Sequence, residues 1–108
     1  MALDTTALVN AMVSAGEHLG ADLWSSIETF AVPELQKIAV QIVAIEKNRD
    51  AFTPEGAKAL LDMQLRASVG VIVAMTTLTL LAVQKAINEI LEAVKGVVNQ
   101  AVKFGLIA

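Results

Sequence analysis

Residues 48–56 read NRDAFTPEG, and this short polar stretch divides the chain into two helical arms. Thr53 offers a side-chain oxygen that can cap a helix, and Pro54 suits the first helical position. Glu55 places a negative charge near the positive end of that helix. No other sharp reversal is predicted along the chain, so we expect the two arms to run antiparallel from a turn at 48–53.

The second arm has no further proline and no cluster of turn residues from Pro54 to about Phe104. Gly70 and Gly96 each weaken a helix by about 1 kcal/mol relative to alanine, which is too little to end one. Apolar residues in the last part of the arm alternate at steps of three and four, which is typical of a heptad seam. We predict one helix over 54–104, with Gly105 as its cap.

The first arm begins with Asp4, Thr5 and Thr6, each of which could cap the N-terminus of a helix. Apolar residues from Leu8 to Phe30 then recur at helical spacing. Pro33 lacks a backbone N–H and restricts the residue before it, which favours a kink or a new start at that point. We predict two helices in this arm, over about 5–31 and 34–49.

These segments predict a single all-α domain over residues 1–108, folded as an elongated antiparallel helical hairpin with a kinked first arm and one long second helix. At 1.5 Å per residue the long helix would reach about 75 Å. The alternative is a compact four-helix bundle, in which the second arm breaks near Gly70 or at Thr76-Thr77. The helical spacing alone leaves both architectures open.

Two helices that touch along one seam need only about two apolar positions per heptad, and this chain supplies more. A lone hairpin would therefore expose an apolar patch larger than monomers usually carry. We predict a homo-oligomer with a coiled-coil assembly interface. The residues of that interface are Leu80, Val83, Ile87, Ile90, Val94 and Val97.

Eighteen residues between Arg66 and Lys85 carry no charge. As one helix they would span about 27 Å, close to the roughly 30 Å of a bilayer's hydrocarbon core. Either this band is the interior of an oligomer, or it faces lipid while the first arm lines a pore. A simple spanning hairpin is disfavoured because Glu28 would lie near the bilayer centre. The buried or lipid-facing residues of the band are Val69, Ile72, Val73, Leu78 and Leu81.

Ser14, His18 and Asp22 lie at four-residue spacing on one helix face. A catalytic triad also needs an oxyanion hole and a pocket, which one helix surface does not provide. His18 with Asp22 or Glu17 gives two metal ligands, whereas zinc needs three or four from the protein. The chain also lacks the common phosphate-loop, zinc-protease and calcium-loop motifs. We therefore predict no enzyme, no catalytic residue, no cofactor, no metal and no small-molecule substrate.

The composition is 56% apolar and 18% charged, with a net charge of −3 and no cysteine. The apolar content excludes a disordered chain. The charge balance gives no electrostatic reason to bind nucleic acid. No lysine or arginine precedes Lys37, so a cleaved secretory signal is not expected. The predicted location is the cytoplasm or a virus particle, with membrane association as the alternative.

The function that these predictions favour is that of a non-enzymatic, self-assembling helical structural protein, such as a component of a bundle, a tube or a virion. Its expected partner is itself. The alternative is a membrane-inserting, pore-forming or holin-like protein that places residues 67–84 in lipid. The size and hairpin shape are loosely similar to small secreted helical-hairpin proteins and to type III needle subunits. The turn at 51–56, AFTPEG, lacks the Trp-x-Gly of the first group and the turn motif of the second, so only the architecture is similar.

Overall fold

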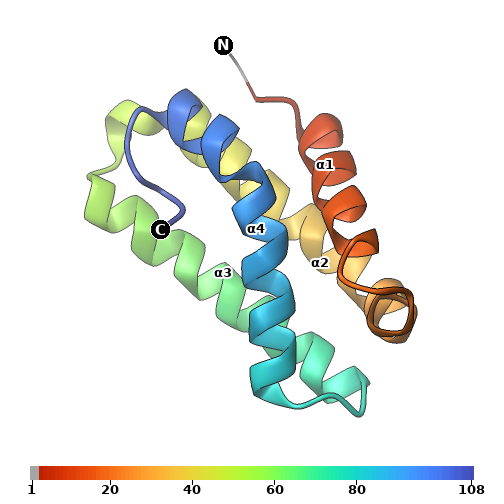
Figure 1. The fold of residues 1–108 in the computed structure, drawn as a ribbon. Coiled ribbons are helices and arrows are strands. Elements are labelled where there is room, and N and C mark those ends of the chain that lie inside the picture. The colour runs from red at the N-terminus through yellow and green to blue at the C-terminus, as the bar shows by residue number, and fades with distance from the viewer. Residues whose placement is uncertain (1–2) are drawn as a thin grey trace.

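The computed structural model describes residues 3–108, which form four α-helices and one short 3-10 helix. In Figure 1, α4 lies at the centre of the bundle, with α3 on one side and α1 on the other. Helix α2 packs against both α1 and α3, and α4 contacts all three other helices. The elements are α1 (Thr5–Glu17), α2 (Ala21–Lys47), η1 (Arg49–Ala51), α3 (Pro54–Met75) and α4 (Leu80–Val102).

The elongated hairpin predicted from the sequence is wrong, and the compact four-helix bundle that was its alternative is observed. The longest dimension is 40 Å and the radius of gyration is 13.4 Å, close to the 13 Å or so expected for a globule of about 100 residues. The helix expected over 54–104 stops at Met75 and a new helix starts at Leu80. Because the chain is not an elongated hairpin, its shape does not resemble that of the small hairpin proteins or the needle subunits.

Threonines break the long helix at the second of the two sites that the alternative named. Thr76 has extended backbone, and its hydroxyl donates to the carbonyl of Ile72 at 2.8 Å. The same oxygen accepts from the backbone N–H of Leu78 at 3.3 Å. Thr79 then caps α4 by accepting from the N–H of Ala82 at 3.2 Å. Threonine hydroxyls thus satisfy backbone groups that a continuous helix would have paired, and α4 folds back against α3.

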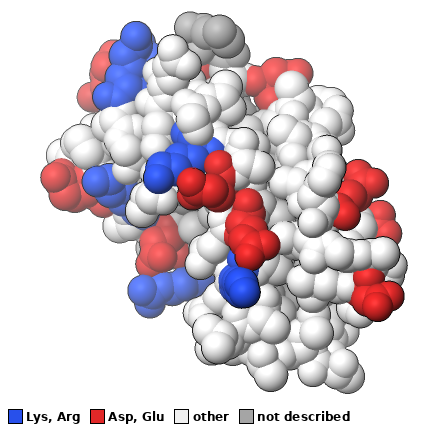
Figure 2. All heavy atoms as spheres, viewed as in Figure 1, with Lys and Arg blue, Asp and Glu red and all other residues white. Residues whose placement is uncertain are grey.

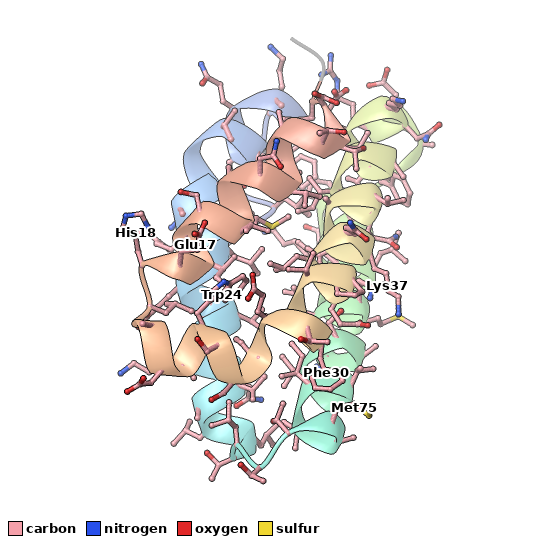
Figure 3. All side chains as sticks on the ribbon, turned by 90° about the vertical axis from the view of Figure 1, so that its right-hand side faces the viewer. Glu17, His18, Trp24, Phe30, Lys37 and Met75 are labelled. Carbon is pink, nitrogen blue, oxygen red and sulfur yellow. The ribbon has the colours of Figure 1, made fainter. Side chains whose placement is uncertain are left out.

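The first arm breaks at a different place from the one predicted. Helix α2 runs through Pro33, and Figure 3 shows it changing direction between its two halves, as a proline kink would produce. Pro33 is exposed, so water can satisfy the carbonyl that loses its helical partner. The interruption lies instead at 18–20, where Gly20 adopts a φ of +118° that glycine alone adopts easily.

This α1–α2 turn folds Trp24 against Gly16. Trp24 is buried, and Figure 3 shows its side chain pointing into the space beneath α1. A Cβ atom added at Gly16 would lie 2.3 Å from a carbon of the indole ring. The absence of a side chain at Gly16 therefore lets the ring pack directly on the backbone of α1.

The core collects the apolar stripes of all four helices. Residues of the predicted stripes such as Met12, Ile38 and Val94 are almost wholly buried. The predicted caps are confirmed, since Asp4 accepts from the N–H of Thr6 and Thr53 accepts from the N–H of Gly56. The largest fully buried side chains are Met12, Ile27, Leu35, Ile38, Ile42, Ile45, Ile72, Val83, Ile87, Ile90, Val94 and Val98.

The end of α4 also differs from the prediction. Lys103, rather than Gly105, adopts the left-handed conformation that ends the helix, with a φ of 72°. The chain then turns back, and Figure 1 shows its last residues lying between α3 and α4. Leu106 and Ile107 are buried there and belong to the core.

Candidate functional site

The α3–α4 hairpin forms an end of the bundle that carries no charge. We call residues 67–84 the apolar end; they comprise the last turns of α3, the loop and the first turn of α4. One side of this segment faces the core through Ser68, Val69, Ile72 and Val83. The exposed positions of α3 on the other side are all apolar or glycine: Ala67, Gly70, Val71, Ala74 and Met75.

Four large apolar side chains are exposed at this end. Met75 is 56% exposed and Val71 40%. Leu80 is 54% exposed and Leu81 74%. Thr77, Thr79 and Gln84 are the exposed polar residues among them. Exposed apolar side chains that lie near one another along the chain differ from the single apolar residues found on most surfaces.

Charged residues gather elsewhere on the molecule. In Figure 2 the lower end of the visible face, which holds the α3–α4 hairpin, shows neither red nor blue atoms. Red and blue side chains alternate above it. On α3, the last charged residue before the apolar end is Arg66, whose Nε atom lies 2.8 Å from Asp62 Oδ2 in an ion pair. The change from mixed charge to none is therefore sharp and occurs just before Ala67.

The predicted assembly interface is divided by the fold. Val83, Ile87, Ile90 and Val94 lie inside the chain's own core, with exposed fractions of about 1% or less. They are placed there because α4 contacts three helices of the same chain, whereas the hairpin gave it one neighbour. Leu80 and Val97 stay exposed. Of the predicted set, only these two side chains are accessible to another molecule.

The predicted buried or lipid-facing band is divided in the same way. Val69 and Ile72 are buried, Val73 and Leu78 are half-buried, and Leu81 is exposed. The band is no longer one helix of 27 Å, because the threonine loop interrupts it. Within residues 3–108, no helix combines the length and the apolar character that crossing a bilayer requires.

Two exposed residues of the apolar end, Val71 and Met75, were not among the predicted site residues. They are four residues apart on α3 and share its outer face with Ala67. The signal for them was present in the sequence, since positions 67, 71 and 75 form a helical row without a polar residue. The row was not distinguished from its neighbours because the charge-free run was interpreted as apolar on all sides, in an oligomer or in lipid.

The polar residues of the predicted Ser14, His18 and Asp22 row lie on two different helices. Figure 3 shows His18 and Glu17 on the outside of the bundle. The Nδ1 atom of His18 lies 2.7 Å from the backbone carbonyl of Ser14, an arrangement that orients the ring at the end of α1. Asp22 lies beyond the turn, on α2. Among the residues that the structure describes, no three histidine, cysteine or acidic side chains are arranged to hold a metal ion.

Comparison with known proteins finds no match: no family model fits the chain, and no curated protein or solved structure is similar to it. The function is therefore argued from the surface of this chain alone. The feature of that surface that most needs a physical explanation is the apolar end.

Proposed function

We propose that this protein is a non-enzymatic, self-assembling helical protein whose copies associate through the apolar end. The observation that carries the proposal is the exposure of Val71, Met75, Leu80 and Leu81 on a surface without charges. A second copy is a suitable partner because its own apolar end is equally uncharged. The net charge of −3 on each copy would disfavour close contact elsewhere, but no charges meet at this surface.

The size of the surface indicates how strong the association is. Fully burying a side chain of this type contributes about 1.5–3 kcal/mol. The four side chains are between 40% and 74% exposed, so on average about half of each remains to be covered. Two apolar ends in contact therefore contribute about 6–12 kcal/mol. Association itself costs about 4–15 kcal/mol in lost motion. The two quantities are similar, so we propose an assembly that depends strongly on protein concentration.

The test is the mass of the particle by sedimentation velocity over a range of protein concentrations. We expect the wild-type chain to be larger than a monomer at high concentration. Leu81→Asp places a charge at the most exposed apolar position, and we expect it to give a monomer with an unchanged helical circular dichroism spectrum. The matched control is Val40→Asp, on the exposed side of α2, where a charge should leave the mass unchanged.

Two results would contradict the proposal. The first is a wild-type chain that stays monomeric at every concentration. The second is a pair of aspartate variants that change the mass equally. A chain that is monomeric in buffer but floats with uncharged phosphatidylcholine vesicles, and loses this property in Leu81→Asp, would indicate that lipid covers the apolar end instead of a second copy.

A further inference from the structure

The sulfur chemistry of this chain belongs to its methionines. The sequence contains four methionines and no cysteine, so thioethers are its only sulfur groups. Peroxides convert an accessible thioether to a sulfoxide, which is polar, and sulfoxide reductases reverse the change. Within residues 3–108 the methionines are Met12, Met63 and Met75, and their surroundings differ. The difference determines what oxidation of each one would do.

Met12 and Met63 represent the two extremes of accessibility. Met12 has no exposed surface and lies in the core, so a peroxide reaches it only when the chain opens. Met63 is 68% exposed on α3, next to the exposed and charged Asp62. Peroxide can therefore reach Met63 in the folded chain, but Met63 lies outside the apolar end.

Met75 is both accessible and part of the apolar end. It is the last residue of α3, and Figure 3 shows its side chain on the outside of the bundle near the end of that helix. More than half of its surface is exposed. Its thioether thus belongs to one of the four large apolar side chains through which we propose that copies associate.

The last turns of α3 are poorly suited to bind a sulfoxide oxygen. The free backbone groups at the C-terminal end of a helix are carbonyls, which cannot donate a hydrogen bond to that oxygen. The hydroxyl of Thr76 already donates to the carbonyl of Ile72 at 2.8 Å. The other exposed residues of α3 at this end are alanine, glycine and valine, which have no side-chain donor. A sulfoxide on Met75 would therefore bind water here, and a second copy that covered it would remove that water.

We propose that Met75 is an oxidation site that controls self-assembly, because its sulfoxide weakens the contact between apolar ends. This inference rests on the proposed function. The sulfur of Met75 gives up two electrons and gains one oxygen atom from hydrogen peroxide, whose other oxygen leaves as water. In the reverse step a sulfoxide reductase takes two electrons from two thiols, which become a disulfide, and the sulfoxide oxygen leaves as water.

Access of peroxide to Met75 depends on association. Because the proposed assembly depends on concentration, a dilute sample contains free copies in which Met75 is exposed. In a concentrated sample a second copy covers Met75 but not Met63. Raising the protein concentration should therefore slow the oxidation of Met75 and leave the rate at Met63 unchanged, which mass spectrometry of peptides from the wild-type chain measures.

The main experiment uses two full-length variants, Met63→Leu and Met75→Leu, and compares each with itself before and after hydrogen peroxide. Sedimentation velocity gives the dissociation constant, and mass spectrometry confirms which methionine is oxidised. Peroxide should raise the dissociation constant of Met63→Leu about tenfold, because Met75 is still present and each copy then buries a polar oxygen without a partner. It should leave that of Met75→Leu unchanged, although Met63 is oxidised. Met1 is common to both variants and cannot cause a difference between them.

Reduction provides a further control on the same samples. Treatment of oxidised Met63→Leu with sulfoxide reductases and a thiol should restore its original dissociation constant, since the thioether is regenerated. The helical circular dichroism spectrum should stay the same throughout, because Met63 and Met75 are both exposed and their oxidation leaves the core intact.

Three results would overturn the proposal: the same change in both variants, no change in Met63→Leu once its Met75 is oxidised, or equal effects of protein concentration on the oxidation of Met63 and Met75. Failure of self-assembly is recognised before peroxide is added. An untreated wild-type chain that is monomeric at every concentration contradicts both proposals, whereas a chain that associates equally well with Met75 oxidised contradicts only this one.

Discussion

The two ends of the bundle are built differently. At the end that holds η1, polar side chains tie distant segments together: Glu46 accepts from the N–H of Leu3 at 2.8 Å, and Arg49 donates to the carbonyl of Ala101 at 3.0 Å. At the apolar end, the side-chain hydrogen bonds of Thr76 and Thr79 reach only residues within four positions. The first end is thus fixed by long-range polar contacts, and the second by apolar packing that remains partly exposed.

Because the two ends differ in this way, the residues that stabilise the fold are different from those that are available for association. Polar contacts that cross between segments, made by Glu46 and Arg49, hold the fold at the first end. The apolar end contributes to the fold through its inner side, with Val69 and Ile72 in the core, while its outer side stays available. Substitutions should therefore act on stability or on association according to the side they change, and the predictions below test that separation.

The largest effect is expected from Ile90→Asp. Ile90 has no exposed surface, so a carboxylate there loses the apolar contacts and is buried without a partner. The loss exceeds about 4 kcal/mol, which is a large part of the stability of a typical domain. We expect the helical circular dichroism signal to be lost at 25 °C. Leu81→Asp, nine residues earlier on the same helix, should keep this signal, and a folded Ile90→Asp chain would contradict the placement of Ile90.

Gly16→Ala is expected to lower the free energy of unfolding by less than Ile90→Asp does. The new methyl group would overlap the indole of Trp24. Overpacking of this kind costs about 1–3 kcal/mol. The matched control is Gly70→Ala at the apolar end, where the added methyl meets open space and favours the helix by about 1 kcal/mol. Urea unfolding followed by tryptophan fluorescence measures both. If both substitutions changed the free energy of unfolding in the same direction, Gly16 would not be in contact with the indole ring of Trp24.

The sequence predicts those parts of the fold that local chemistry decides. The turn at 48–53 and the helix start at Pro54 follow from a cap, a proline and an acid in consecutive positions, and the structure has them there. The break at 76–79 was only an alternative, because threonines weaken a helix slightly and tertiary burial of α4 supplies the rest. The break at Gly20 depends on a positive φ that the apolar spacing does not reveal.

The sequence predicts where the candidate site lies but not which of its side chains are exposed. The charge-free run located the apolar end, but helical spacing alone does not tell which apolar residues meet the chain's own core. Ile87 was predicted at an interface between copies and lies inside, whereas Leu81 was predicted to be buried or to face lipid and is exposed. Helical spacing also does not reveal the hydrogen bonds of Asn99, because its partner Ile107 reaches it only after the reversal at Lys103.

The polar contacts near the end that holds η1 are tested by Asn99→Ala, which removes both hydrogen bonds to Ile107. We expect a loss of about 1–2 kcal/mol, since two groups of the segment lose their partners. Hydrogen exchange of the Ile107 amide should speed up more than exchange in the middle of α2. Asn88→Ala is the control, and it should change neither quantity because that side chain is exposed. Unchanged exchange at Ile107 would contradict the role of Asn99.

The smallest effect is expected at the apolar end itself, from Thr79→Ala. The Thr79 hydroxyl accepts from the N–H of Ala82, so its removal leaves a helix N-terminus without a cap and costs about 1 kcal/mol. Thr77→Ala is the matched control, since Thr77 is exposed in the same loop and caps neither helix. Thermal unfolding should separate the two by a few degrees. Because neither substitution adds a charge, both should keep the particle mass of the wild-type chain. A lower mass for Thr79→Ala would mean that association depends on how α4 begins, and that stability and association are coupled at this end.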